Sequence, residues 1–312
     1  METPSHRFSE ETLPNLQYPS VSIIVPYFRD CHHHLRHCLW CLEHQTYPPT
    51  QCEIVVVDNH PTPRITEDLL GRDRISIVHE PVPGSYAARN RGIASSTGSI
   101  LAFTDVECAP TPTWLNNAIQ ELARFDFNAV VGGKIVFGYR ECANPNIWEI
   151  YDSIIHLRQR DYIVHDRFAA TANLIAPRKL FLQMGLFNSA FYSGGDKDWG
   201  MRLSSQSIPV IYSADVVVLH RARHNAHEII EKNRRGVGAE LVRVQISKTF
   251  RVQILRAQIR MFVPRFRVLM KETRIRAYGH WTQLRLSVIF ALICIVRCYE
   301  AIRLIFGGQP LR

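Results

Sequence analysis

The chain has 312 residues, and with 46% of them hydrophobic and 21% charged it is too apolar to be a disordered protein. It can bury one large core or two modest ones. The net charge of +9 is uneven, because residues 1–220 hold 18 basic and 23 acidic side chains whereas residues 221–312 hold 19 and 5. We therefore expect anionic partners at residues 221–312.

The N-terminal residues and the cysteines bear on the compartment. Met1–Ser20 is polar and lacks the apolar segment of a secretory signal, and we expect residues 1–18 to form a flexible arm. The 8 cysteines are scattered rather than gathered in a compact framework, which favours reduced thiols. These features predict a cytoplasmic protein.

Apolar runs alternate with helical patterns from residue 19 to residue 110. The expected strands are Val21–Val25, Glu53–Val57, Ile75–Val78 and Ser99–Thr104, and the expected helices span about 31–45 and 84–96. Unbroken apolar strands separated by helices are typical of a parallel α/β sheet. Ligands of such sheets bind beyond the C-terminal strand ends. Pro26, Asp58 and Asp105 all lie at such ends, which predicts one site.

The pattern continues less regularly to residue 220. We expect helices at about 114–125 and 178–184 and after Gly194-Gly195, strands at 129–137 and 172–176, and a partly helical excursion at 140–170. The two apolar runs within residues 210–219 predict a hairpin or two short strands that complete the domain and end at His220.

The basic residues 221–312 form a separate segment. We expect one or two long helices over 226–262, an interruption at Pro264, and an apolar helix from Leu284 to Phe306. The unbroken apolar run Leu286–Val296 is shorter than the roughly 20 residues that span a membrane. Arginines among Ile, Leu and Phe instead predict a helix lying on an anionic membrane surface. The alternative is a basic helical domain packed on the core.

Asp105 and Glu107 follow the strand Ser99–Thr104, one residue apart, and would point the same way if the extended backbone continued. Two converging carboxylates at a buried strand end repel each other and favour a cation. Hard carboxylate oxygens suit Mg²⁺ or Mn²⁺, with phosphates as further ligands. The alternative is a solvated loop that carries two acids.

Several short motifs run in the order of a known family, from about Val21 to His220. They are Ser22–Tyr27, the block Gln45–Asn59, the segment Gly84–Gly92 with Ala88-Arg89-Asn90, the acids of Phe103–Glu107 followed by Trp114-Leu115, and Gly194–Asp198 with Arg202. Singly each motif is common, but together they are specific. The chain resembles the family 2 glycosyltransferases of the GT-A fold.

The resemblance implies an α/β fold of GT-A type, with a mixed, mostly parallel sheet flanked by helices. The GT-A domain would span residues 19–220, with a donor half at about 19–110 and an acceptor half at about 111–220, followed by a basic helical extension at 221–312. The implied reaction moves a sugar from a nucleotide-diphosphate sugar, usually a uridine one, to a hydroxyl group of a glycan or lipid-linked acceptor. It proceeds by a single metal-assisted displacement with inversion.

The resemblance also implies roles for individual residues. Asp196 matches the carboxylate that deprotonates the acceptor. The implied donor-binding residues are Pro26, Tyr27, Asp58, Arg89 and Asp105, the implied Mn²⁺ or Mg²⁺ ligands are Asp105, Glu107 and His220, and the implied acceptor-side residues are Asp198, Trp199 and Arg202. Asp58 and Asp198 could instead cap a turn or helix, and His220 could be bonded to backbone.

Two positions depart from the family pattern. Glu107 stands where the family has Asp, which affects metal geometry, and Arg29-Asp30 replaces a common Asn. A catalytically silent, membrane-associated partner that keeps the fold is one alternative. A nucleotidyltransferase is another, although Pro26–Asp30 is not the Gly-rich, Lys-containing loop that it needs. The basic charge comes with no nucleic-acid motif, so nucleic acid is not an expected partner.

Overall fold

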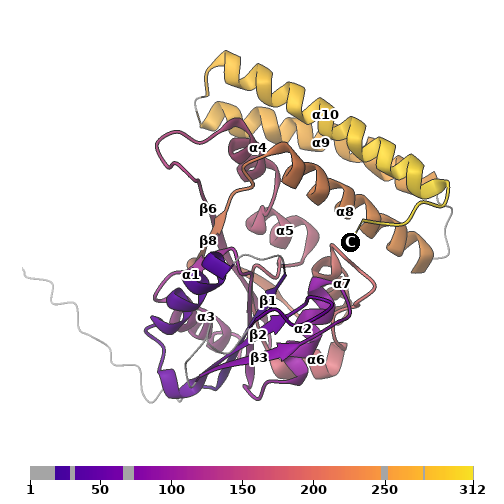
Figure 1. Ribbon diagram of the computed structural model, residues 1–312. Helices are drawn as coiled ribbons and strands as arrows, with labels where there is room; N and C mark the ends of the chain where they lie inside the picture. The colour runs from indigo at the N-terminus through magenta and orange to yellow at the C-terminus, as the bar shows by residue number, and fades with distance from the viewer. Residues whose placement is uncertain (1–17, 29–31, 66–73, 247–251, 277, 312) are drawn as a thin grey trace, which may run out of the picture.

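The computed structural model describes residues 18–28, 32–65, 74–246, 252–276 and 278–311. Nearly all of the arm expected at residues 1–18 and the Arg29-Asp30 pair lie outside these residues. Within them the chain forms one 8-stranded sheet with helices on both faces (Figure 1).

The sheet has the order β3-β2-β1-β4-β7-β6-β8-β5. Its strands are β1 (Val21–Tyr27), β2 (Cys52–Asp58), β3 (Ile75–His79), β4 (Ile100–Thr104), β5 (Cys108–Pro110), β6 (Val130–Gly138), β7 (Asn173–Pro177) and β8 (Val210–Arg221). The first four strands in this order pair in parallel, as do β6 and β8. The strand β7 is antiparallel to β4 and β6, and β5 is antiparallel to β8. The α/β class and the mixed sheet are thus confirmed.

Helices cover both faces of the sheet, which explains why its strands are apolar without interruption. The helices are α1 (His32–Glu43), α2 (Ser85–Ala94), α3 (Trp114–Ala123), α4 (Ile147–Ile155), α5 (Gln159–Asp166), α6 (Arg178–Met184), α7 (Gly195–Ser205), α8 (Ala226–Ile246), α9 (Val252–Ile275) and α10 (His280–Ile305), with a 3₁₀ turn at Pro49–Gln51. Along β1, Ile23 packs with α1 and α3 residues and Ile24 packs with α2 residues on the opposite face. This alternation is that of a strand buried on both sides.

The strands β6 and β8 carry an irregularity that shapes one end of the sheet. Their register shifts between Gly133 and Lys134. The Asn173 side chain donates to the carbonyls of Lys134 (3.0 Å) and Val216 (2.9 Å) and accepts from the indole of Trp114 (2.9 Å). The bulge therefore has its backbone groups satisfied by one buried side chain, and β8 continues beyond it to reach His220.

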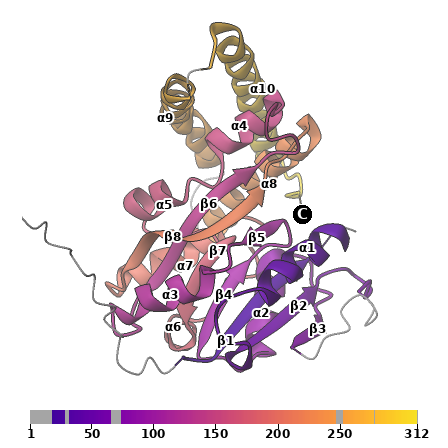
Figure 2. The ribbon, with the colours of Figure 1, turned by 90° about the vertical axis from the view of Figure 1, so that its left-hand side faces the viewer.

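The helices α8, α9 and α10 form the C-terminal layer. In Figure 1 α8 lies between the sheet and the pair α9–α10, and Figure 2 shows these helices beyond the ends of β6 and β8. Tyr151 and Ile154 of α4 pack in one cluster with Ile229, Leu269 and Phe290 of the three helices. The extension is therefore packed on the core through α4 and α8.

Most elements lie where the sequence predicts them, but three expectations are wrong. Residues 210–221 form the single strand β8 rather than a hairpin or two short strands. Pro264 lies at an exposed position inside α9 and does not interrupt the helix. Asp105–Glu107 is a turn, not extended chain, and is followed by the unpredicted strand β5. No helix in the described ranges is long and apolar enough to cross a bilayer.

Candidate functional site

A cavity of about 340 Å³ opens where the parallel strands β1, β2 and β4 end, and we call it the central cavity. It is lined by Pro26, Phe28, Asn59, Pro83, Gly84, Ser85, Arg89, Asp105, Val106, Glu107, Tyr192, His220, Arg223, Glu228, Lys232 and Arg235. Its position at the C-terminal strand ends is the one expected for ligand binding in a parallel sheet. Five of the residues singled out in the sequence are among this lining: Pro26, Arg89, Asp105, Glu107 and His220.

Arg89 and Asp105 form an ion pair in the central cavity. The Arg89 Nη2 atom lies 2.5 Å from Asp105 Oδ1, and their side chains are 4% and 34% exposed. The Arg89 Nη1 atom donates to the Ser85 carbonyl, while its Nε–H is buried without a partner among the described atoms. The pair gives a buried guanidinium its counter-charge and leaves part of the Asp105 carboxylate facing the cavity.

Glu107 and His220 are brought to the cavity by the pairing of β5 with β8. Cys108 lies opposite His220 in this ladder, and the Arg221 amide donates to the Glu107 carbonyl at 3.1 Å. A turn closed by the Cys108 amide on the Asp105 carbonyl (2.9 Å) precedes the strand. Although the backbone is not extended here, both carboxylates reach the same cavity.

The ring of His220 has its tautomer set by a backbone contact. His220 Nδ1 lies 2.7 Å from the carbonyl oxygen of Arg221, which can only accept a hydrogen bond. In the neutral imidazole Nε2 then carries the free lone pair. This is the arrangement by which metal-binding histidines are oriented, and it also satisfies the backbone at a strand end.

The loop before α2 forms another side of the cavity. Asn59 donates to the carbonyls of Glu80 and Val82 (both 2.8 Å) and accepts from the Gly84 amide (2.9 Å). Gly84 has φ +132°, a conformation that L side chains rarely adopt. The glycine therefore lets the chain turn into α2 with its N-terminus beside the cavity, which favours an anion there.

Asp58 and Tyr27 lie next to the cavity but are engaged within the protein. The buried Asp58 carboxylate accepts from the amides of His60, Arg64 and Ile65 at 2.6–3.1 Å and contacts the His60 ring at 2.6 Å. Burial opposes its charged form, but these hydrogen bonds lower the pKa of Asp58. The Tyr27 hydroxyl lies 3.0 Å from His32 Nδ1. A donor-binding role for either residue stays a prediction.

Helix α8 and the residues before it supply charged groups that the sequence reasoning did not assign to the site. Arg223, Glu228, Lys232 and Arg235 line the central cavity from this segment. The last three are spaced by four and three residues, so they lie on one helical face, which is the signal that could have identified them. The basic segment therefore contributes directly to the site at the end of the sheet.

Arg223 is held by contacts with a buried acid, and Lys232 is affected by burial and by charged neighbours. The Arg223 guanidinium and amide both contact the fully buried Asp152 of α4, at 2.9–3.3 Å. Burial lowers the pKa of Lys232 to about 8, and Arg223 and Arg235 act in the same direction, whereas Asp196 and Asp105 oppose them. Burial therefore disfavours the charged form of Lys232, and the charges of Asp196 and Asp105 offset part of that cost.

The segment expected on the acceptor side lies just outside the lining of the central cavity. Asp196 is in the first turn of α7, and Gly195 packs against the Tyr86 ring, whose pKa is raised well above its ordinary value by burial and by Asp196. Asp198 pairs with Arg202 at 3.2 Å, and Trp199 is fully buried with its ring stacked on Phe181.

Arg202 also donates to the carbonyls of Met184 and Leu186, which ties α7 to the end of α6. The observed contacts of Asp198, Trp199 and Arg202 are therefore structural. Acceptor contacts of these residues stay predictions.

The central cavity is lined by both acids and cations, a combination that suits an anion bound together with a metal ion. In the described part of the chain no group of three or more His, Cys, Asp or Glu side chains could hold a metal by itself. Mg²⁺ and similar ions are commonly held by one or two carboxylates plus substrate phosphates. Asp105, Glu107 and His220 fit such a partial ligand set, because all three line the cavity.

Solved structures support the fold. The mannosyltransferase PcManGT from Pyrobaculum calidifontis, solved with GDP-Man and Mn²⁺, superposes with a TM-score of 0.61 over 92% of this chain and 88% of that one, at 17% identity. TarS of S. aureus superposes with a TM-score of 0.51 over 69% of this chain and 38% of its own, also at 17% identity. The chain thus has the GT-A-type fold of these proteins.

Sequence comparisons give the family. Glycosyltransferase AglE of Haloferax volcanii is 31% identical over 225 residues, 70% of this chain and 73% of its own. The pre-mycofactocin glycosyltransferase of Mycobacterium tuberculosis is 28% identical over 186 residues, 57% of this chain and 39% of its own. The family model described as glycosyl transferase family 2 matches residues 22–180. By this match and by the likeness to AglE, the chain belongs to glycosyl transferase family 2.

Proposed function

We propose that this glycosyltransferase moves a sugar from a nucleotide-diphosphate sugar, with uridine as the expected nucleotide, to a hydroxyl group of a glycan or lipid-linked acceptor. The observation that carries the proposal is the charge pattern of the central cavity. Asp105, Glu107 and Glu228 line this cavity together with Arg89, Arg223, Lys232 and Arg235. A diphosphate with a divalent cation carries both signs of charge and so complements both kinds of group.

Departure of the diphosphate leaves negative charge that the protein must stabilise. Asp105, Glu107 and His220 are the proposed ligands of Mn²⁺ or Mg²⁺, and such an ion supplies positive charge to the leaving phosphates. Lys232 on α8 and Arg223 just before α8 are the proposed donors to phosphate oxygens, and Arg89 adds positive charge beside Asp105. The Mn²⁺ and GDP-Man of the solved mannosyltransferase support this assignment.

The attacking hydroxyl must lose its proton, and Asp196 is the proposed base. Asp196 and Asp105 both raise the pKa of Lys232, which supports a location of Asp196 close to the proposed phosphate site. In one displacement the acceptor oxygen bonds to the anomeric carbon, its proton passes to the Asp196 carboxylate, and the bond to the diphosphate breaks with its electron pair. This path inverts the anomeric centre.

We further propose that α9 and α10 attach the enzyme to the inner face of a membrane. One side of α10 bears an exposed apolar row spaced by three or four residues: Trp281, Leu284, Val288, Leu292, Ile295, Tyr299, Ile302 and Phe306. On α9 an exposed basic row comprises Arg256, Arg260, Arg267, Lys271 and Arg274. Apolar and basic rows together suit an anionic lipid surface.

A donor screen tests the proposed reaction. The full-length protein is incubated with a panel of nucleotide sugars and Mn²⁺, and thermal stabilisation and sugar release are measured. One donor should stabilise the protein and be turned over, and chelation should abolish both effects. Asp196→Asn should bind that donor normally but transfer sugar about a hundredfold or more slower. A protein that responds to no donor, or an Asp196→Asn variant with normal transfer, would refute the corresponding assignment.

A further inference from the structure

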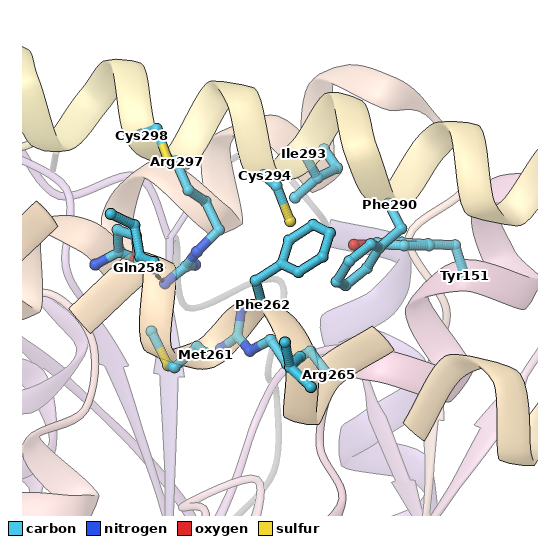
Figure 3. Close-up of a pocket in the computed structure, with 12 residues that line it drawn as sticks. Tyr151, Gln258, Met261, Phe262, Arg265, Phe290, Ile293, Cys294, Arg297 and Cys298 are labelled. Atoms are coloured by element: carbon cyan, nitrogen blue, oxygen red, sulfur yellow. Dashed lines mark hydrogen bonds between the residues drawn. The ribbon is translucent and has the colours of Figure 1, made fainter. Parts of the chain in front are cut away.

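A second cavity, of about 290 Å³, lies between α9 and α10 next to α4, and we call it the helical cavity. Figure 3 shows the aromatic rings of Phe262 and Phe290 inside it, with Tyr151 at one end and Arg297 and Gln258 at the other. The lining is mostly apolar, and its polar groups belong to Arg265, Arg297, Gln258 and Tyr151. Its volume is near the lower end of the range of small-molecule sites, about 300–1,000 Å³. None of its lining residues belongs to the central cavity.

Arg297 is a buried cation whose hydrogen-bond partners among the described residues are neutral. The residue is only 7% exposed, and its guanidinium donates to the side chains of Asn233 (3.1 Å) and Gln258 (2.6 Å). Burial lowers the pKa of Arg297 to about 9 and Arg265 acts in the same direction, whereas Tyr151, Glu240 and Cys294 oppose them. Hydrogen bonds to amide oxygens satisfy its N–H groups but do not neutralise its charge.

Arg265 brings a second guanidinium to the same cavity. It lines the cavity from α9 and is partly buried. Across the described residues neither Arg265 nor Arg297 has a carboxylate within ion-pairing distance, although nine other arginines of these residues do. Two like charges in an apolar pocket disfavour each other and favour an anion between them.

The rest of the helical cavity suits a hydrocarbon chain. Phe290 and Ile293 are almost fully buried, whereas Ile259, Phe262 and Val263 on α9 are 61%, 43% and 50% exposed. The cavity therefore has a buried apolar interior and a rim of exposed apolar side chains. A ligand that enters over this rim passes apolar surface before it meets the arginines.

We propose that the helical cavity binds a lipid with a phosphate headgroup, its hydrocarbon chain between α9 and α10 and its phosphate on Arg265 and Arg297. Charge-assisted hydrogen bonds from two guanidinium groups match a phosphate, and the apolar lining matches the chain. Because α8 separates this cavity from the central cavity, the site is distinct from that of sugar transfer. The proposal does not depend on the assigned donor or on the metal.

Calorimetric titration of the full-length protein with decyl phosphate, below the concentration at which it forms micelles, tests the proposal. We expect saturable binding of one molecule per chain. Inorganic phosphate, which has the headgroup alone, and decyl maltoside, which has the chain with a neutral head, should each bind at least about tenfold more weakly. Binding of inorganic phosphate as tight as that of decyl phosphate would overturn the lipid assignment, and equal binding of decyl maltoside would overturn the role of the arginines.

Matched variants separate the site from general surface charge. Arg265→Gln should weaken decyl phosphate binding by about tenfold or more, because it removes one charge-assisted contact. Arg285→Gln removes the same charge from an exposed position of α10 that does not line the helical cavity, and it should leave binding unchanged. Equal losses in the two variants would contradict a specific site.

A cavity-filling variant tests whether the hydrocarbon chain of the ligand occupies the helical cavity. Cys294→Phe fills the cavity from its half-buried position on α10 and should abolish binding of decyl phosphate while nucleotide-sugar binding is retained. Retained nucleotide-sugar binding shows that the variant is folded and separates this proposal from the proposed function. If this folded variant still binds decyl phosphate as tightly as the wild type, the hydrocarbon chain of the ligand does not occupy the helical cavity, and the proposal is overturned.

Discussion

At the scale of single residues, Lys232 should make the proposed donor binding sensitive to pH. Burial lowers the pKa of Lys232 to about 8, so its ammonium loses its proton as the pH rises through that value. A bound diphosphate favours the charged form, and donor affinity should therefore fall above about pH 8 by up to about tenfold per pH unit. Titrations of the nucleotide sugar at a series of pH values measure this slope.

Two variants show whether Lys232 causes the pH effect. Lys232→Met should bind donor about tenfold or more weakly at neutral pH and lose the dependence near pH 8. Lys179→Met removes the same charge from an exposed position on α6 and should behave as the wild type does. A pH profile that Lys232→Met leaves intact would contradict the assignment.

The Arg89–Asp105 pair couples the stability of the protein to its site. Asp105→Asn leaves the buried Arg89 guanidinium without a counter-charge and should lower the free energy of unfolding by about 2–4 kcal/mol, besides removing a proposed metal ligand. Arg89→Gln in the same chain should restore part of this loss, with a coupling of about 1–3 kcal/mol. Denaturant unfolding of the two single variants and the double variant measures the coupling, and strictly additive losses would mean that the pair is not coupled.

At the scale of elements, the bulge between β6 and β8 depends on a glycine. A Cβ atom on Gly133 would lie 2.1 Å from the Val216 carbonyl oxygen and 2.3 Å from Asn173 Nδ2, so the backbone would have to shift. Gly133→Ala should therefore lower the free energy of unfolding by about 2 kcal/mol or more. Gly138→Ala is the control on the same strand, because nothing lies within 4 Å of its Cβ. Equal melting temperatures for the two variants would show that the bulge relaxes freely.

The elements that the sequence misplaces share a physical cause. The strand β5 spans Cys108–Pro110 only and exists because β8 passes beside it, which no local pattern in so short a segment can indicate. Pro264 is a helix breaker by its local chemistry, but the packing of α9 on α4, α8 and α10 outweighs the lost hydrogen bond. The long apolar strands β1, β2 and β4 are predicted correctly because burial on both faces dictates their composition.

At the scale of the whole molecule, the apolar row on α10 should hold the enzyme on membranes. Substituting Leu292 and Ile295, which are 51% and 65% exposed, by Glu should reduce binding to vesicles that contain phosphatidylserine by about tenfold or more. Co-sedimentation of the full-length protein with such vesicles measures the bound fraction. Raising the salt concentration should also weaken binding, because the basic row on α9 is screened.

The control for this experiment lies on another face of the protein. Leu182 on α6 is 80% exposed and apolar, and Leu182→Glu should leave vesicle binding unchanged. If the α10 double variant binds vesicles as well as the Leu182→Glu variant does, the apolar row is not the membrane contact.

The sequence by itself determined the α/β class, the strand ends that carry the site and the family, because these follow from local apolar runs and from short ordered motifs. It also located Arg89, Asp105, Glu107 and His220, which all line the central cavity. From the sequence, residues 221–312 were predicted to be a separate basic segment, because net charge does not show which face of a helix packs on the core.

Only the tertiary structure decided that α8 and the residues before it pack over the strand ends and bring Arg223, Lys232 and Arg235 to the acids. It likewise decided that Arg265 and Arg297 of two successive helices meet in one apolar cavity. Such contacts join segments far apart in the chain, and they arise from the burial of apolar helix faces, which fixes where the charged groups on those helices must lie.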